Sequence, residues 1–344
     1  MVGAIVRELE LRCDYLTDKT THTVYFGGGT PSLLSEAQLA RILEAVHKIY
    51  KVHPDAEITL EANPDDLTLQ KLKELKRSSV NRLSIGVQSF FDEDLLLMNR
   101  AHHAAMAEQC ILDAAAAGFD NLTIDLIYGV PGLSHERWKR NLDKAFSLPV
   151  QHLSCYNLTV ETKTALYKMV KEGKVADVND EHSAQQFLML MDLAEANGFE
   201  HYEISNFARP GFYSRHNTAY WQNKPFIGIG PSAHSYNGDT RQWNVSSNAA
   251  YIASISRGEV PATVENLTAE NRYNEYIMTR LRTMWGVDAD EIKTDHGESF
   301  LKDFILQIHP FIESGDVVRA GTIYTLSRSG KLIADRIASR LMVV

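Results

Sequence analysis

Apolar positions along the chain recur with two different spacings, and these spacings predict alternating strands and helices in the first half of the sequence. Short apolar runs rich in β-branched and aromatic residues predict strands, whereas apolar residues three and four positions apart predict amphipathic helices. The predicted strands are Thr23–Phe26, Glu57–Glu61, Arg82–Val87, Asn121–Ile127 and His152–Tyr156. The predicted helices are Val2–Leu16, Ser35–Tyr50, Leu67–Lys76, segments within Asp92–Ala117, and His135–Ser147. Repeated strand–helix units with right-handed crossovers imply an α/β fold, with a parallel sheet and helices outside it.

The regular alternation ends after Tyr156. We expect a loop over Leu158–Lys168, a helix over Asp180–Gly198, and an irregular segment rich in aromatic residues, Gly and Pro over Phe207–Tyr236. The tail predicts further helices at Asp288–Lys293, Phe300–Glu313 and Lys331–Leu341, with a hairpin formed by Val317–Arg319 and Thr322–Leu326. This order is typical of a winged-helix-like domain. Because Lys302 is accompanied by Asp303 and Glu313 on one helix, a structural or partner-docking role is favoured over DNA binding.

The composition narrows the class of protein. The 344 residues are 44% hydrophobic and 23% charged, as in ordinary globular proteins. A net charge of −9 argues against a nucleic-acid partner bound through phosphate neutralisation. Cys13, Cys110 and Cys155 are far apart and odd in number, so they predict no disulfide framework and favour a reducing cytoplasm. No apolar run approaches the length of a membrane span.

A triple glycine follows the first predicted strand. The segment Tyr25–Pro31 reads YFGGGTP, and a helix begins shortly after it. Glycines at such a corner accept positive φ and let backbone N–H groups approach a ligand closely. The segment therefore predicts a small-ligand site at the carboxyl end of the sheet. Since it lacks the Lys-Ser/Thr of a phosphate-binding loop, a phosphate ligand is disfavoured.

Polar side chains also stand at or near the ends of the later predicted strands. These residues are Glu61, Gln88, Asp125 and Asn157. A single carboxylate at a strand end is usually a helix-cap partner or a solvated residue. Acidic groups in such an arrangement can bind an ammonium or vicinal hydroxyls, and backbone N–H groups can bind a carboxylate. The coincidence over consecutive strands predicts a zwitterionic, ribose-bearing ligand.

Several ordered blocks resemble a known family. These blocks are Tyr25–Ser35, Leu60–Asp66, Arg82–Phe90, Asn99–His102, Ile124–Gly132, Tyr202–Gly211, Arg215–Trp221 and Gly228–Tyr236. Through them the chain resembles the oxygen-independent coproporphyrinogen III oxidase-like branch of the radical S-adenosylmethionine (SAM) proteins, and within that branch the heme chaperone HemW type. The likeness runs from about Tyr25 to Trp243, and the tail is similar to the family's C-terminal domain.

The resemblance implies a partial (β/α)6 TIM-like barrel that holds S-adenosylmethionine at its mouth, followed by a C-terminal α+β winged-helix-like domain. It divides the chain into a barrel at residues 1–160, a barrel extension at 161–245, and a C-terminal domain at 246–344. By the same resemblance, the residues that would bind S-adenosylmethionine are Gly28, Gly29, Thr30, Glu61, Gln88, Arg100, Asp125, Thr159 and His234.

The family's chemistry depends on a CxxxCxxC loop after the first barrel strand, where three thiolates hold a [4Fe–4S] cluster. This sequence contains no such loop, and the resemblance places the first strand and the loop upstream of Met1. We expect no cluster binding by the chain as written, and a cluster only if that segment exists. Two explanations remain open: a start placed too late or a trimmed chain, and a truncated relative that only binds ligands. The open sheet edge that would remain favours the first.

The segment His216–Trp221 reads HNTAYW. A lone His beside aromatic residues is more often a hydrogen-bonded, semi-buried residue than a metal ligand. The resemblance favours the ligand, because the heme chaperone type carries this HNxxYW pattern; it assigns heme to His216, Asn217, Tyr220 and Trp221. We therefore expect a cytoplasmic heme-binding chaperone that delivers heme to hemoproteins, with membrane contact only through partner proteins.

Two alternatives remain beside the chaperone. One is a radical SAM enzyme of porphyrin biosynthesis that oxidises coproporphyrinogen III, inert without the cluster loop. The other is an inactive domain that binds neither ligand.

Overall fold

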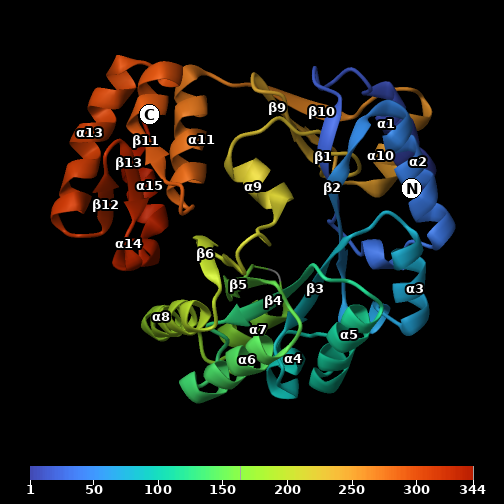
Figure 1. The fold of residues 1–344 in the computed structure, drawn as a ribbon, viewed down its shortest axis with the longest axis horizontal. Helices are drawn as coiled ribbons and strands as arrows, with labels where there is room; N and C mark the ends of the chain where they lie inside the picture. The colour runs from blue at the N-terminus through green and yellow to red at the C-terminus, as the bar shows by residue number, and fades with distance from the viewer. Residues whose placement is uncertain (163, 344) are drawn as a thin grey trace. The chain divides into compact units, whose positions relative to one another are not determined.

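The computed structural model describes residues 1–162 and 164–343 (Figure 1). Lys163, within the segment expected to be a loop, and Val344, the last residue of the expected C-terminal domain, lie outside the described residues. The chain forms two compact units. The first comprises Met1–Thr23, Ala37–Ala56 and Arg215–Val344, and the second comprises Val24–Glu36 and Glu57–Ser214.

A seven-stranded sheet forms the frame of the second unit, although its two first strands also reach into the first. Its strand order is β1 (Thr20–Phe26), β2 (Lys51–Ala62), β3 (Arg82–Gln88), β4 (Leu122–Tyr128), β5 (His152–Asn157), β7 (Asn206–Ala208) and β6 (Glu200–Glu203). The strands β2 to β5 are parallel neighbours, and β7 and β6 continue the sheet antiparallel. The sheet curls into a half-barrel, which confirms the α/β partial-barrel prediction.

All five strands predicted from the pattern are present. The strand β2 begins six residues earlier than predicted, because Lys51–Ala56 carries Pro54 and exposed polar residues that hide the pattern. The antiparallel strands β6 and β7 were not predicted as strands. They are only four and three residues long, too short to show a period.

Helices connect these strands. They are α3 (Leu69–Arg77), α4 (Asp92–Leu97), α5 (Ala104–Ala116), α6 (His135–Ser147), α7 (Ala165–Lys171) and α8 (Asp180–Ala196), with short 3₁₀ turns at Pro31–Leu33 and Pro64–Asp66. Ser134 accepts a hydrogen bond from the Arg137 N–H and so caps α6. The loop expected over Leu158–Lys168 is wrong in part, because α7 begins at Ala165, after the N-cap Thr164.

The core of the second unit lies between its sheet and helices. Leu60, Leu83, Ile85, Ile124 and Leu153 on the parallel strands are fully buried. Alternating with them are polar residues aligned across the sheet: Glu61 is in register with Ser84, and Asp125 with Ser154. The buried residues fix the register, so the polar residues collect on the other face towards the carboxyl ends of the strands.

The first unit combines helices with two small antiparallel sheets. Its N-terminal helices are α1 (Val2–Leu11) and α2 (Glu36–Ile49), the latter beginning one residue before this unit. Next come α9 (Arg215–Trp221), β8 (His234–Tyr236), β9 (Thr240–Asn244), α10 (Asn248–Ser256) and β10 (Ala262–Asn266). The sheet order is β10–β9–β8. The segment expected to be irregular, Phe207–Tyr236, thus contains the last two residues of β7, the helix α9 and the strand β8. All three elements are too short for a clear period.

The C-terminal part of this unit surrounds a second sheet, of order β11–β13–β12. Its elements are α11 (Ala269–Leu281), β11 (Val287–Asp288), α12 (Ala289–Glu291), a π-helical turn (Ile292–His296), α13 (Glu298–Glu313), β12 (Val317–Ala320), β13 (Ile323–Leu326), α14 (Arg328–Leu332) and α15 (Ala334–Leu341). In Figure 1 the helices α11, α13 and α15 lie around this sheet. The predicted hairpin at Ala320-Gly321 is confirmed, with Arg319 opposite Tyr324.

The helix predicted over Val2–Leu16 is shorter than expected. It ends at Leu11, and the guanidinium group of the next residue, Arg12, donates to Ser235 Oγ at 3.0 Å and Gln242 Oε1 at 3.2 Å. Glu8, also fully buried, accepts from Arg12 at 3.1 Å. In the described part of the chain, no helix is long and apolar enough to cross a membrane.

Candidate functional site

The glycine corner and Glu61 form one hydrogen-bonded group in the second unit. The Tyr25 hydroxyl donates to Glu61 Oε1 at 2.8 Å, and the Gly28 N–H donates to Glu61 Oε2 at 3.2 Å. Gly28 and Gly29 have φ angles of 67° and 113°, in the region that favours glycine. The end of β1, the loop that follows it and the end of β2 are therefore joined through one carboxylate.

Asp125 completes a pair of acidic side chains with Glu61. Burial, and next the charge of Glu61, raise the pKa of Asp125 to about 7, while a hydrogen bond with Ser154 and the guanidinium groups of Arg100 and Arg82 oppose the rise. Burial and the same two carboxylates also raise the pKa of Tyr25 far above its usual range, so its hydroxyl remains a donor. Such a pair of carboxyl groups attracts a cationic or polyhydroxyl ligand.

Gln88 and Arg100 meet beside Gly86 on β3. A β-carbon added to Gly86 would lie 2.9 Å from Gln88 Nε2 and 3.2 Å from Arg100 Nη2. Arg100 Nη2 also donates to Asn63 Oδ1 at 2.8 Å and to the Gly86 carbonyl at 3.2 Å. A side chain at this position would therefore displace both groups, and the bare glycine permits their approach.

Most residues predicted to bind S-adenosylmethionine fall into these two groups. The structure brings together Gly28 with Glu61 and Gln88 with Arg100, and the charge of Asp125 links to both groups through Glu61 and Arg100. Gly29 and Thr30 lie in the same loop as Gly28.

The other two residues predicted for this ligand stand apart from those groups in the chain. Thr159 lies just after β5, and its side chain is exposed. His234 is exposed on β8 of the first unit, where its ring stacks on Trp243 at 6.1 Å. Its segment is anchored from within that unit, because the Gly230 N–H donates to buried Glu8 at 2.8 Å. The roles of Thr159 and His234 remain predictions.

The sequence interpretation missed three residues of this site. Tyr25 and Asn63 hydrogen-bond Glu61 and Arg100, and Ser154 hydrogen-bonds Asp125. Tyr25 and Asn63 lie inside the resembling blocks, so the blocks did contain the signal. Ser154 lies in none of them, and its role follows only from its register opposite Asp125.

The HNTAYW segment lies on the helix α9 in the first unit. Spacing of four places His216 and Tyr220 on one face of that helix, with Asn217 and Trp221 adjoining. His216 Nδ1 lies 3.1 Å from Thr23 Oγ1. The rings of Tyr220 and Trp221 are 5.3 Å apart and nearly perpendicular.

Two further groups of the first unit lie near the aromatic rings of this helix. Phe226 lies 5.6 Å from the Tyr220 ring, and the Arg282 guanidinium lies 5.5 Å from the centre of the Trp221 ring. Among the described residues, Thr218 Oγ1 and Trp221 Nε1 are buried polar atoms without a hydrogen-bond partner. An aromatic surface with a histidine, a cation and orphaned donors suits a flat apolar ligand that carries carboxylates.

The cysteines do not fit a [4Fe–4S] cluster. Cys110 is buried on α5, where burial raises its pKa to about 12, and Cys155 is buried on β5 with its pKa raised further. Cluster ligands are thiolates, and these two thiols remain protonated at neutral pH. Over residues 1–162 and 164–343, no group of three His, Cys, Asp or Glu side chains could hold a metal ion.

Comparisons with known proteins identify the family and the fold of this chain. The Radical SAM superfamily matches residues 4–145, and the HemN C-terminal domain matches residues 267–333. A solved structure described as coproporphyrinogen III oxidase (HemN) from Escherichia coli, a radical SAM enzyme, superimposes with a TM-score of 0.84 at 22% identity. The superposition covers 99% of this chain and 82% of that one, so the two share a fold.

Curated relatives show the family. The heme chaperone HemW of Bacillus subtilis (strain 168) is 35% identical over 317 residues, which cover 92% of this chain and 84% of that protein. The heme chaperone HemW of Mycobacterium tuberculosis (strain ATCC 25618 / H37Rv) is 34% identical over 343 residues, which cover 98% and 85% respectively. The chain therefore belongs to the heme chaperone HemW family of the radical SAM proteins.

Proposed function

We propose that this protein is a heme-binding chaperone that delivers heme to hemoproteins in the cytoplasm, and that it holds S-adenosylmethionine at the carboxyl ends of the parallel strands. The observation that carries the proposal is the family: relatives named heme chaperones match along more than nine tenths of the chain. The acceptor in this proposal is a protein that takes up heme.

The surroundings of His216 support heme as the cargo. A histidine that binds a metal through one ring nitrogen is commonly held by a hydrogen bond at the other, and Thr23 Oγ1 lies 3.1 Å from His216 Nδ1. Tyr220 and Trp221 offer apolar ring surface. The buried Trp221 N–H suits a carboxylate of a porphyrin, and so does the Arg282 guanidinium, which lies 5.5 Å from the centre of the Trp221 ring and also pairs with Asp335 at 3.4 Å. Asn217 is proposed as a heme contact on the resemblance alone.

The residues at the strand ends fit S-adenosylmethionine. Glu61 and Asp125 can accept hydrogen bonds from its ammonium group and ribose hydroxyls, and Arg100 can bind its carboxylate. Backbone N–H groups of the loop Gly28–Thr30 would meet the methionine end. When bound, S-adenosylmethionine brings a sulfonium cation to this acidic edge. In the structure Glu61 already bonds Tyr25 and Gly28, so binding would exchange part of that pairing for contacts with the ligand.

The alternative, oxidation of coproporphyrinogen III, has support from the shared fold with HemN alone. The described residues supply no thiolate set for the cluster on which that reaction would depend.

A transfer experiment tests delivery. The heme-loaded protein is mixed with the apo-form of a b-type cytochrome, and separately with apomyoglobin as a scavenger that reports spontaneous heme loss. Delivery predicts a transfer rate that rises with cytochrome concentration and exceeds the rate of scavenging. A rate independent of the cytochrome, and equal to the rate with apomyoglobin, would argue against a chaperone.

A further inference from the structure

The end of β3 has a strained backbone at Gln88. Gln88 has a φ of 68°, in the left-handed region, and the Ser89 N–H donates to the Val87 carbonyl at 2.9 Å. Gln88 is therefore the central residue of a γ-turn, and the register of β3 with β4 shifts between Ile85 and Gln88. For a residue other than glycine this conformation persists only where the surroundings hold it.

His102 holds one side of the turn. It is buried, and its Nε2–H donates to the Val87 carbonyl at 3.0 Å, the same oxygen that accepts from Ser89. Burial lowers the pKa of His102, so the ring is neutral at pH 7 and its single N–H is committed to that carbonyl. Two donors thus fix the peptide group that precedes Gln88.

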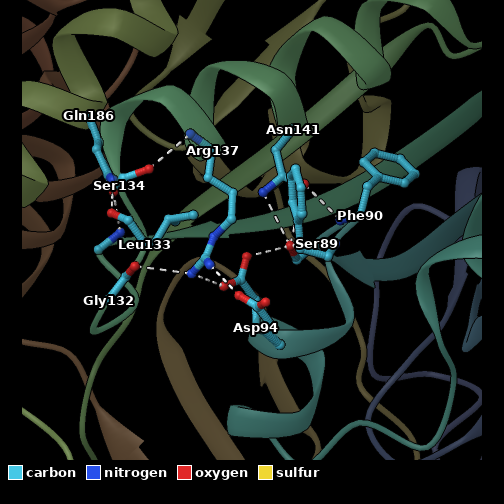
Figure 2. Close-up of polar contacts among 12 residues, drawn as sticks. Ser89, Phe90, Asp94, Gly132, Leu133, Ser134, Arg137, Asn141 and Gln186 are labelled. Atoms are coloured by element: carbon cyan, nitrogen blue, oxygen red, sulfur yellow. Dashed lines mark hydrogen bonds and ion pairs between the residues drawn. The ribbon is translucent and has the colours of Figure 1, made fainter.

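Asn141 on α6 holds the other side. Its Oδ1 accepts from the Phe90 N–H at 2.7 Å, and its Nδ2–H donates to Ser89 Oγ at 3.1 Å. The Ser89 hydroxyl in turn donates to Asp94 Oδ2 at 2.7 Å. Ser89, Asp94 and Asn141 are all buried, and Figure 2 shows Asp94 and Asn141 contacting Ser89 and Asn141 also contacting Phe90.

Arg137 connects this cluster to the loop after β4. Its Nη2 donates to Asp94 Oδ1 at 2.7 Å and to the Gly132 carbonyl at 3.1 Å (Figure 2). Burial raises the pKa of Asp94, and the Ser89 hydroxyl and the Arg137 charge oppose that rise. Arg137 therefore neutralises a buried carboxylate whose other oxygen is used by the turn.

We propose that His102 and Asn141, with Asp94 and Arg137 behind them, are positioning residues that hold the strained Gln88 turn and thereby aim its side-chain amide beside Arg100. The inference rests on the proposed S-adenosylmethionine site and deepens it. In a regular strand, side chains alternate between the two faces of the sheet. The strained turn gives the Gln88 side chain a direction that this alternation would not give.

The test measures the dissociation constant of S-adenosylmethionine by equilibrium dialysis, and the melting temperature in parallel, on the full chain. We expect affinity to fall about 10-fold in Gln88→Ala, His102→Ala and Asn141→Ala. In the double variants with Gln88→Ala we expect no further loss, since the positioning residues act through that side chain. His102→Gln can donate to the Val87 carbonyl and should recover most of the affinity.

His103→Ala is the matched control. The neighbouring His103 accepts from the Met106 N–H and caps α5 without touching the turn, so its loss should lower the melting temperature and leave affinity unchanged. Gln88→Gly should weaken binding and yet raise the melting temperature, because glycine adopts positive φ without strain.

The results of these measurements distinguish failure of the proposed S-adenosylmethionine site from failure of the proposed positioning role. If the wild type does not bind S-adenosylmethionine, or Gln88→Ala binds it equally well, the proposed site is wrong. If Gln88→Ala loses affinity while His102→Ala and Asn141→Ala keep it, the site stands and the positioning role is overturned. Should Asn141→Ala fail to fold, the pair His102→Ala and His102→Gln decides alone.

Discussion

A β-carbon on Gly27 would lie 2.9 Å from Glu61 Oε1 and 2.6 Å from the Tyr25 ring. The first glycine of the triple is therefore needed for the space that Tyr25 and Glu61 occupy, whereas Gly28 and Gly29 are needed for their positive φ. The same loop therefore leaves space for Glu61 at Gly27 and holds the Glu61 carboxylate through the N–H of Gly28.

Gly27→Ala should displace Glu61 and weaken binding of S-adenosylmethionine at least about 10-fold, which corresponds to about 1.4 kcal/mol. Equilibrium dialysis measures this effect. Gly3→Ala is the matched control, because a β-carbon on Gly3, in the helix α1, would meet only Arg41 at an ordinary 3.8 Å. The control should stabilise the protein slightly, by up to about 1 kcal/mol. Equal affinity in Gly27→Ala and wild type would contradict the steric argument.

Tyr25→Phe removes the hydroxyl that donates to Glu61 Oε1. The half-buried carboxylate then loses one donor, and we expect a loss of about 1 kcal/mol in the free energy of unfolding. Urea denaturation followed by circular dichroism measures it. A variant as stable as the wild type would show that water replaces the tyrosine hydroxyl without cost.

Asp125→Asn should change how stability depends on pH. The pKa of Asp125 in the folded protein is raised to about 7, above its usual value of 3.8. The folded state thus binds more protons than the unfolded state between these values, and stability from this group falls as pH rises from about 4 to 7. The groups facing Asp125 are Glu61, Ser154, Arg100 and Arg82.

Asn carries no such penalty, so Asp125→Asn should melt at a higher temperature than the wild type at pH 8. The difference should shrink at pH 5.5. Differential scanning calorimetry at the two pH values measures both. A difference in melting temperature that stays the same at both values would show that Asp125 does not titrate in this range.

Thr23→Val removes the hydroxyl that lies beside His216 Nδ1. Without that hydrogen bond the imidazole is less well oriented, and we expect heme affinity to fall about 10-fold, as for groups that orient metal ligands elsewhere. Thr21→Val, two residues earlier on β1, should bind heme like the wild type. Absorbance titration compares the two, and equal affinities would argue that the Thr23 hydroxyl does not orient the imidazole.

The sequence predicted the parallel strands well, because buried residues such as Leu83 and Ile124 on continuous apolar runs leave little choice of element. It predicted less where an element is short, or where polar residues obscure the regular spacing of apolar residues. Polar residues around Pro54 concealed half of β2, and the seven residues of α9 gave too little pattern to distinguish a helix from a loop. The helix α7 was missed for the same reason.

Some residues of the candidate site are predictable from their place at strand ends, and others only from the family resemblance. Glu61, Gln88 and Asp125 are predictable because each stands at or near the end of a predicted strand. Arg100 had no such signal, since its place beside Gly86 depends on a fold that brings it back to β3. The γ-turn at Gln88 was not predictable, because its restraints come from His102 and Asn141, distant in sequence.

Heme binding at α9 is tested most directly by a heme titration followed at the Soret band. The wild type should saturate with one heme, and His216→Ala should lose at least about 10-fold in affinity or shift the Soret maximum. His309→Ala, an exposed histidine on α13, should behave as the wild type does. Identical titrations of the wild type and His216→Ala would contradict the account.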